Sequence, residues 1–161
     1  MSLFDITNEI IIDHNNVRDL FSRYKSASDL ALKTKIAYTL IQEIMIHGNA
    51  EEASVYKRFK EFGMSDAAEQ DIEDHHEINK LLGDAKVVDP SESTFDQTLS
   101  RAVTLFMEHS DEEENAQLNK IAEQIEPEES DKLAKEFLAA RKVAAGSMGS
   151  PQVELKHSHN A

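Results

Sequence analysis

Apolar residues recur along the chain at steps of three and four positions, which places them on one face of an α-helix. The alternation of apolar and polar residues that is typical of a strand is absent. The pattern predicts four amphipathic helices in succession. Their buried stripes run through Leu3, Ile6, Ile10, His14, Val17, Phe21 and Tyr24; Ile36, Leu40, Ile44, His47, Glu51, Val55, Phe59 and Phe62; Ala68, Asp71, His75, Ile78, Leu82 and Ala85; and Phe95, Leu99, Ala102, Phe106, His109, Glu113 and Ala116.

Short segments rich in helix-ending and helix-starting residues separate the stripes. These segments are Ser26–Asp29, Gly63–Asp66 and Val88–Ser93. Because short connections make consecutive helices antiparallel neighbours, we expect an all-α fold, an up-down antiparallel four-helix bundle. Pro127, at the favoured first position of a helix, predicts a short fifth C-terminal helix to about Val143.

The length of the chain suits one folded unit. We expect residues 1–145 to form the bundle with its C-terminal helix. Residues 146–161, which begin Gly-Ser-Met-Gly-Ser-Pro, have the composition of a flexible tail.

Composition narrows the possible functions. The absence of cysteine excludes disulfides, thiolate ligands and a cysteine nucleophile. A formal net charge of −14 argues against binding to nucleic acid or to an anionic membrane, because both need basic surface. No apolar run reaches the roughly 20 residues of a membrane span, and the N-terminus lacks the pattern of a signal peptide. We therefore expect a cytoplasmic protein; the sequence does not identify its protein partners.

Histidines interrupt each of the four apolar stripes, at His14, His47, His75 and His109. In an antiparallel pair, two residues at one height are equidistant from the turn between their helices. The position midway between each successive pair of these histidines falls at or within a few residues of a predicted turn. The spacing therefore predicts that the four histidines share one layer of the bundle.

Acidic residues lie one helical turn from three of these histidines. Glu51 and Glu113 follow His47 and His109 by four positions, and Asp71 precedes His75 by four. Residues four apart share a helix face, so these acids are expected to form a second layer beside the histidines, with Ile10 at the fourth position.

Buried carboxylates cost several kcal/mol unless they are paired or bind metal, and the stripes carry no lysine or arginine to pair with them. The seven residues His14, His47, Glu51, Asp71, His75, His109 and Glu113 are therefore candidate metal ligands. Histidine and carboxylate ligands without thiolate suit iron or manganese best, and zinc is possible. Two alternatives remain open: His76 could replace His75, and a local register change could bring Glu114 inward. Otherwise Glu114 is expected to form a solvated acidic rim with Glu52, Asp111 and Glu112, and Tyr56 to be a packing residue.

Four sequence segments resemble the hemerythrin-like family, whose members carry the HHE cation-binding domain. The resemblance covers about Ile6 to Asn119 and rests on Ile12-Asp13-His14-x-x-Val17-x-x-Leu20-Phe21, Glu43-Ile44-x-x-His47-x-x-x-Glu51-Glu52, Glu73-Asp74-His75-His76-Glu77-Ile78-x-x-Leu81-Leu82 and His109-x-x-x-Glu113-Glu114. It implies a bundle that holds two non-haem iron ions per chain, with the four histidines as terminal ligands and with Glu51 and Glu113 as bridges.

The chain differs from the oxygen-carrying hemerythrins of marine worms at two places. Those proteins have a histidine where this chain has Asp71, and their last helix carries His-x-x-x-x-Asp where this chain has His-x-x-x-Glu. A carboxylate in place of a neutral imidazole favours ferric iron and opposes reversible oxygen binding. We expect a di-iron protein that binds or senses O2, peroxide or NO, or that serves iron homeostasis. The alternatives are a di-iron oxidase or peroxide-decomposing enzyme, and a regulatory module in which iron changes the docking of the fifth helix or the tail.

Overall fold

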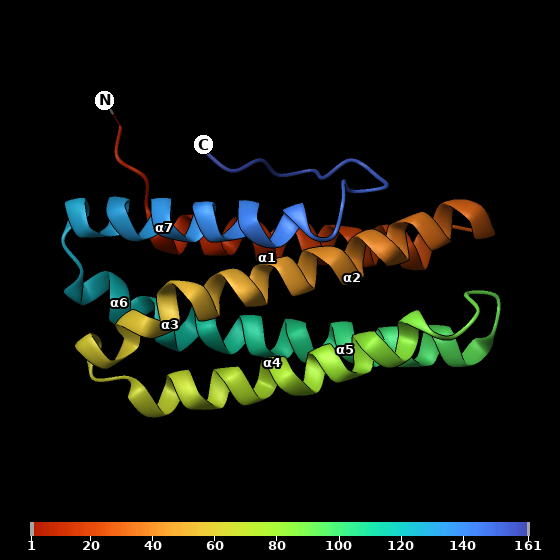
Figure 1. Ribbon diagram of the computed structural model, residues 1–161, viewed down its shortest axis with the longest axis horizontal. Helices are drawn as coiled ribbons and strands as arrows, with labels where there is room; N and C mark the ends of the chain where they lie inside the picture. Colours follow the sequence, from red (N-terminus) through yellow and green to blue (C-terminus); the bar gives the residue numbers. More distant parts are fainter. Residues whose placement is uncertain (1, 161) are drawn as a thin grey trace.

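The computed structural model describes residues 2–160, and this part of the chain is helical without strands (Figure 1). The expected all-α bundle with a C-terminal helix is confirmed. Its elements are α1 (Ile6–Ser26), α2 (Leu30–Ala53), α3 (Val55–Arg58), a 3-10 turn (Phe59–Phe62), α4 (Ser65–Lys86), α5 (Ser93–Glu112), a π-helical turn (Glu113–Gln117), α6 (Leu118–Gln124) and α7 (Pro127–Gly146).

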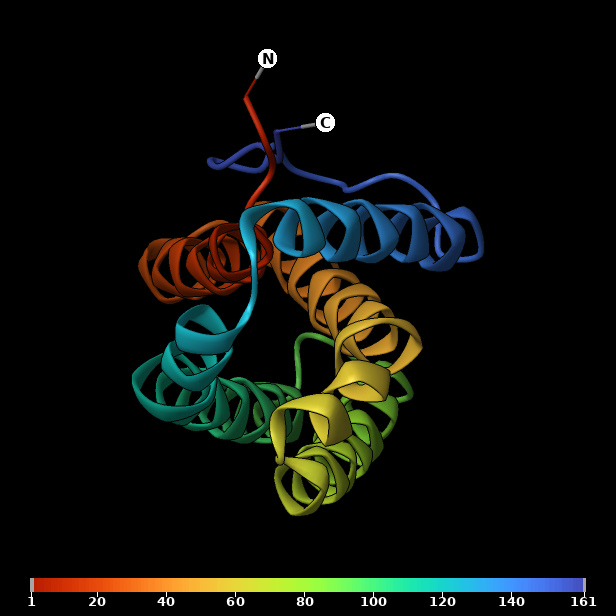
Figure 2. The ribbon, with the colours of Figure 1, turned by 90° about the vertical axis from the view of Figure 1, so that its left-hand side faces the viewer.

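The long helices pack as two antiparallel pairs, α1 with α2 and α4 with α5. The end view in Figure 2 shows these helices around a common interior, with α7 lying outside the first pair. Asp5 and Asp29 cap α1 and α2 by accepting hydrogen bonds from the amides of Thr7 and Leu32. These caps and short turns set the helices antiparallel, which brings the polar positions of the stripes to one level.

The second predicted helix is broken near Ser54, whereas its apolar stripe continues to Phe62. The Ser54 hydroxyl donates a hydrogen bond of 2.6 Å to the Ala50 carbonyl, and the Ser54 backbone leaves the helical region. A serine that bonds back to the preceding turn bends a helix. Gly63, with a φ of 70°, then ends the following 3-10 turn in the left-handed conformation that glycine tolerates.

The chain also departs from regular α-helical geometry directly after α5, where a π-helical turn begins at Glu113 and ends at Gln117. Such turns insert an extra residue into a helix and are frequent at functional sites. Here the turn lies directly beside the predicted ligand layer.

The hydrophobic core is divided into two clusters. One includes Leu20, Leu40 and Phe106, and the other includes Ile10 and Phe137. The predicted histidine and glutamate layers lie between these clusters. Across residues 2–160, no helix combines the length and the apolar character needed to cross a bilayer.

Residues 147–160 run back from the end of α7 along α1, forming hydrogen bonds with α1 and α2 on the way (Figure 1). The division at residue 146 and the flexibility of the segment beyond it stay predictions. The contacts of this segment bear on the site described next.

Candidate metal centre

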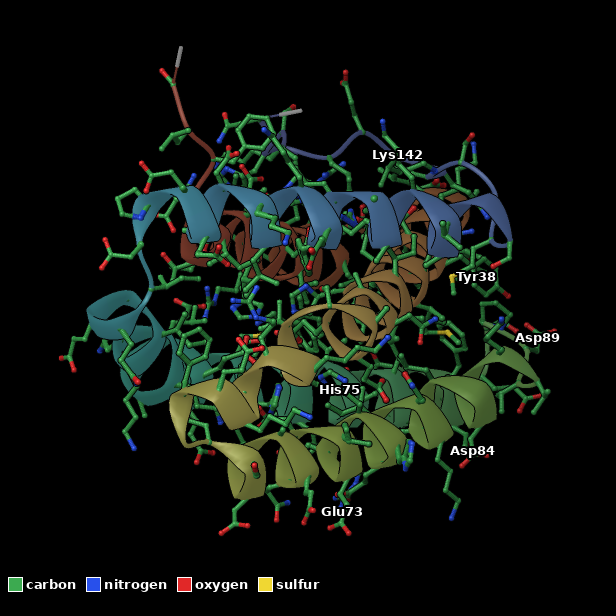
Figure 3. The ribbon with its side chains drawn as sticks, turned by 60° about the vertical axis from the view of Figure 1, so that its left-hand side comes forward. Tyr38, Glu73, His75, Asp84, Asp89 and Lys142 are labelled. Carbon is green, nitrogen blue, oxygen red and sulfur yellow. The ribbon has the colours of Figure 1, made fainter. Side chains whose placement is uncertain are left out.

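The four predicted histidines meet inside the bundle, one from each of α1, α2, α4 and α5. Their exposed fractions are 1% for His14, 0% for His47, 3% for His75 and 5% for His109. The Nε2 atoms of His14 and His47 are 3.2 Å apart. Figure 3 shows His75 turned into the bundle, whereas Glu73 of the same helix points away from it.

Each of these rings has a carboxylate at its outer nitrogen, Nδ1. The pairs are His14 with Glu114 at 2.6 Å, His47 with Asp13 at 2.7 Å, His75 with Glu52 at 3.3 Å, and His109 with Asp74 at 3.2 Å. A carboxylate at Nδ1 keeps the proton there and leaves the Nε2 lone pair free to bind metal. All four rings therefore present the metal-binding nitrogen to the interior.

Glu51 and Glu113 lie among these inner nitrogens, and each spans two histidines. Glu51 Oε1 is 2.9 Å from His47 Nε2 and 3.5 Å from His75 Nε2. Glu113 Oε1 is 3.3 Å from His14 Nε2, and its Oε2 is 3.6 Å from His109 Nε2. Both carboxylates are fully buried. Two groups of possible metal ligands result, His14 with His47 and Glu113, and His75 with His109 and Glu51.

Two carboxylate oxygens of this centre need a further partner. Within residues 2–160, Glu51 Oε2 and Glu113 Oε1 are buried and have no hydrogen-bond partner. Leaving buried polar groups unpaired is costly, and a cation between the two groups would satisfy both oxygens. The donor set of imidazole nitrogens and carboxylate oxygens thus fits a pair of divalent metal ions.

Tyr56, which we expected to be a packing residue, reaches the middle of the centre. Its hydroxyl lies 3.0 Å from Glu51 Oε1, 3.2 Å from Glu113 Oε2, 3.2 Å from His75 Nε2 and 3.5 Å from His109 Nε2. Burial and the charges of Glu113 and Glu51 raise the pKa of Tyr56 well above its usual value. The phenol therefore stays protonated and can donate a hydrogen bond to either glutamate.

Asp71 is buried as well, and within residues 2–160 its Oδ2 has no hydrogen-bond partner, but its Oδ1 lies on the outer side of the His109 ring. Its Oδ1 accepts a hydrogen bond of 3.1 Å from Gln117 Nε2 and is 3.7 Å from His109 Nδ1. Asp71 groups with Asp74 and His109 and not with the inner nitrogens. Burial and the charges of Glu113 and Glu51 raise its pKa to about 8. A role for Asp71 as a direct ligand stays a prediction.

The protonation of the histidines reflects the acids around them. Burial opposes a charged ring, but the acids outweigh it: Glu51 and Asp13 raise the pKa of His47 to about 10. Glu51 and Glu52 likewise raise the pKa of His75 to about 9. In the metal-free chain these rings hold protons, which a bound cation would displace.

The two glutamates differ in their protonation although both are buried. Burial raises the pKa of a carboxyl, but His47 and His75 outweigh burial at Glu51 and hold its pKa well below the usual value. Burial and the charge of Glu51 raise the pKa of Glu113. Two negative charges on neighbouring buried carboxylates repel each other, so ionised Glu51 favours the protonated form of Glu113.

Two acids that we expected in a solvated rim contact the histidines instead. Glu52 and Glu114 reach His75 and His14, and Arg18 also pairs with Glu114 at 2.8 Å. Glu114 thus approaches the centre without replacing Glu113. His76 is exposed and takes no part in the cluster.

Two known proteins are similar to this chain over most of its length. A DNA nickase from Nostoc sp. is 25% identical over 137 residues, which cover 85% of this chain and 39% of the nickase. An uncharacterised hemerythrin-like protein from Schizosaccharomyces pombe is 25% identical over 140 residues, which cover 85% of this chain and 69% of that protein. The chain therefore spans about two fifths of the first relative. No solved structure matches it.

The family profile described as the hemerythrin HHE cation binding domain matches residues 5–121. This range runs from the cap of α1 to α6 and includes every histidine and glutamate of the centre. Both the fold and the resemblance expected from the sequence are thereby confirmed, and the chain belongs to the hemerythrin family of HHE cation-binding domains.

Proposed function

We propose that the chain binds two iron ions in this centre and uses them to bind or sense O2, peroxide or NO, or to serve iron homeostasis. His14, His47 and Glu113 would hold one ion, and His75, His109 and Glu51 the other. Glu51 and Glu113 each span histidines on two helices, which suits them to bridge the ions. Bound iron would supply redox chemistry toward the small ligand.

The observation that carries this proposal is the convergence of four Nε2 atoms on two buried carboxylates that retain unpaired oxygens. Ionic pairing with lysine or arginine would satisfy these oxygens equally well, but within residues 2–160 Glu51 and Glu113 pair only with histidines. Nitrogen and oxygen ligands without thiolate favour iron or manganese, with zinc as a further possibility.

Reconstitution of the metal-free protein with ferrous iron under anaerobic conditions tests the stoichiometry. Elemental analysis should give about two ions per chain, as expected for two carboxylate-bridged histidine groups. Glu113→Ala should bind one ion or none, whereas Glu112→Ala, which changes the exposed neighbouring residue, should bind as many as the unaltered chain. One ion or fewer in the unaltered chain would contradict the proposal.

Exposure of the reduced iron form to O2, hydrogen peroxide or NO would then identify the ligand. A stable and reversible charge-transfer band with O2 supports oxygen binding. Rapid conversion to a ferric spectrum, with no recovery on removal of oxygen, supports a sensor or an oxidase.

The position of Tyr56 favours one second candidate, a peroxide-decomposing enzyme. A buried hydroxyl 3.0 Å from Glu51 and 3.2 Å from Glu113 can hold or move a proton within the centre. Release of dioxygen from hydrogen peroxide, followed with an oxygen electrode, distinguishes this enzyme from a binding protein. The DNA cleavage implied by the name of the Nostoc relative is not part of the proposal, because the chain spans 39% of that relative and has a net charge of −14.

A further inference from the structure

The segment after α7, residues 147–160, is tied to α1 and α2 by a series of polar contacts. The contacts join the Met148 carbonyl to Gln42, the Gln152 amide to Thr39, the Glu154 carbonyl to Arg23, both backbone groups of His157 to Asn16, and the Asn160 side chain to Glu9. Val153 and Leu155 also pack against the first core cluster. These contacts carry the segment along α1 toward the metal centre.

His159, near the end of this segment, bonds to two buried acids of α1. Its Nδ1 lies 2.7 Å from Glu9 Oε2, and its Nε2 lies 2.7 Å from Asp13 Oδ1. Glu9 is fully buried and Asp13 is 3% exposed. The two acids thus hold the His159 ring at both nitrogens, and Arg141 Nε of α7 also lies 3.1 Å from His159 Nε2.

The second oxygen of Asp13 connects His159 to the metal centre. Asp13 Oδ2 is 2.7 Å from His47 Nδ1, the outer nitrogen of a proposed ligand. One carboxylate therefore lies between two imidazoles, one from the C-terminal segment and one from the centre. Arg141 of α7 also approaches Asp13 Oδ1 at 3.4 Å, but it makes a shorter contact of 3.0 Å with Glu43.

We propose that His159 is a positioning residue for the metal centre, acting through Asp13 to fix the orientation of the His47 ring. The proposal rests on the proposed metal function. With one oxygen of Asp13 held by His159, the other is fixed toward His47, so the ring enters metal binding already oriented. Without His159, Asp13 can rotate toward Arg141, and His47 gains freedom that metal binding must remove. Because coupling between two sites is reciprocal, bound metal also favours docking of the C-terminal segment.

Metal affinity of the full chain tests the proposal, with His157→Ala as the matched control. His157 lies in the same segment, but it contacts the Asn16 side chain only through its own backbone N–H and carbonyl, so substitution of the His157 side chain preserves these contacts. Loss of the direct hydrogen-bond partner of a ligating histidine costs about 10–100-fold in metal affinity. Asp13 is that partner of His47, and His159 contacts Asp13, so the effect of His159 is expected at the lower end of this range. We expect His159→Ala to weaken zinc binding by about tenfold in a chelator competition. His157→Ala should bind zinc as the unaltered chain does.

A double-mutant cycle tests whether the effect passes through Asp13. In the Asp13→Asn background, adding His159→Ala should have little further effect, because the connecting carboxylate is already lost. An equal loss of affinity in both backgrounds would show that His159 acts by another route and would overturn the proposal. So would affinities that are identical in the unaltered chain, His157→Ala and His159→Ala.

A second readout needs no metal. In metal-free protein with 15N-labelled histidine, the His47 Nδ1 resonance should shift in His159→Ala and remain unchanged in His157→Ala. An unchanged His47 resonance in both variants would overturn the proposed connection. If the unaltered chain binds no metal, the proposed function fails by itself, and this resonance still tests the connection between His159 and His47.

Discussion

Each acid that holds a histidine at its outer nitrogen is the immediate sequence neighbour of another residue of the centre. Asp13 precedes His14, Glu52 follows Glu51, Asp74 precedes His75, and Glu114 follows Glu113. Neighbouring residues on a helix point about 100° apart, so one member of each pair faces inward while the other reaches sideways. The sequence contains these pairs and predicts which helices are neighbours, but it does not tell on which side of a helix its neighbour lies, and that determines whether an acid meets solvent or a histidine.

Tyr56 could not be predicted from helical spacing. In an uninterrupted helix it would point about 140° away from Glu51, which excludes it from the ligand face. The break at Ser54 turns the chain so that the hydroxyl approaches both glutamates. A serine four positions after an alanine, such as Ser54 after Ala50, also occurs in many unbroken helices, so the sequence alone does not indicate the break.

We expect Tyr56→Phe to keep both metal ions and to lower the stability of the metal-free protein. The substitution removes the hydrogen-bond donor that Glu51 and Glu113 share, and unpaired buried polar groups cost about 1–3 kcal/mol. Urea unfolding of the metal-free protein measures the change. Tyr38→Phe is the control, because the Tyr38 ring packs edge-on against Phe95 in the first core cluster. An equal stability for both variants would contradict a role of the Tyr56 hydroxyl in the centre.

At the scale of elements, hydrophobic spacing predicted the helices and the common level of the four histidines. That prediction was correct because the height of a residue in an antiparallel pair depends only on its distance from the turn, and Gly63 and Pro90 mark two of the turns clearly. The breaks in regular geometry, near Ser54 and in the π-helical turn after Glu112, were not predicted. They depend on packing between helices, which a one-dimensional pattern does not contain.

Close approach of α2 and α4 depends on Gly48. A Cβ atom added at Gly48 would lie 3.2 Å from His75 Nδ1, a ring already held by Glu52 and Tyr56. We expect Gly48→Ala to displace the ring and weaken metal binding, while the helix itself tolerates alanine. A zinc titration of the variant measures this effect.

Gly83→Ala is the matched control on α4, where an added Cβ atom meets nothing within 4 Å. It should leave metal affinity unchanged and stabilise the protein by about 0.5–1 kcal/mol, because alanine favours helices over glycine. Equal metal affinity in both variants would show that the His75 ring can move aside freely.

For the molecule as a whole, we expect metal-free protein to lose stability as the pH rises from about 7 to 10. His47 and His75 titrate near 10 and 9 in the folded chain, above the ordinary value of 6.5. Their contribution is therefore complete below about pH 6.5 and is lost as the pH rises through the folded values. Asp71, with a pKa of about 8, acts in the same direction, because its folded form holds a proton that the unfolded chain releases.

Thermal unfolding of chelator-treated and metal-loaded protein across this range is the measurement. A pKa difference of one unit corresponds to about 1.4 kcal/mol, so a fall of several degrees is expected without metal. Bound metal displaces these protons and stabilises the folded state. The melting temperature of the loaded protein should therefore be higher and should change less with pH. Parallel curves for the two forms would contradict the assignment of these groups to a metal centre.

The acids beside the ligands also select the handedness of the bundle. Two mirror arrangements, in which successive helices turn clockwise or anticlockwise, bury apolar stripes almost equally well. The acid of α1 reaches α2, that of α2 reaches α4, that of α4 reaches α5, and that of α5 and its π-helical turn reaches α1. In the sequence, the acid comes one position before the neighbouring ligand on α1 and α4, and one position after it on α2 and after α5. Because α1 and α4 run opposite to α2 and α5, both orders turn the acid in the same direction around the bundle axis. Only one of the two arrangements closes this ring of bonds, so the residues that orient the histidines also specify the order in which the helices wind around them.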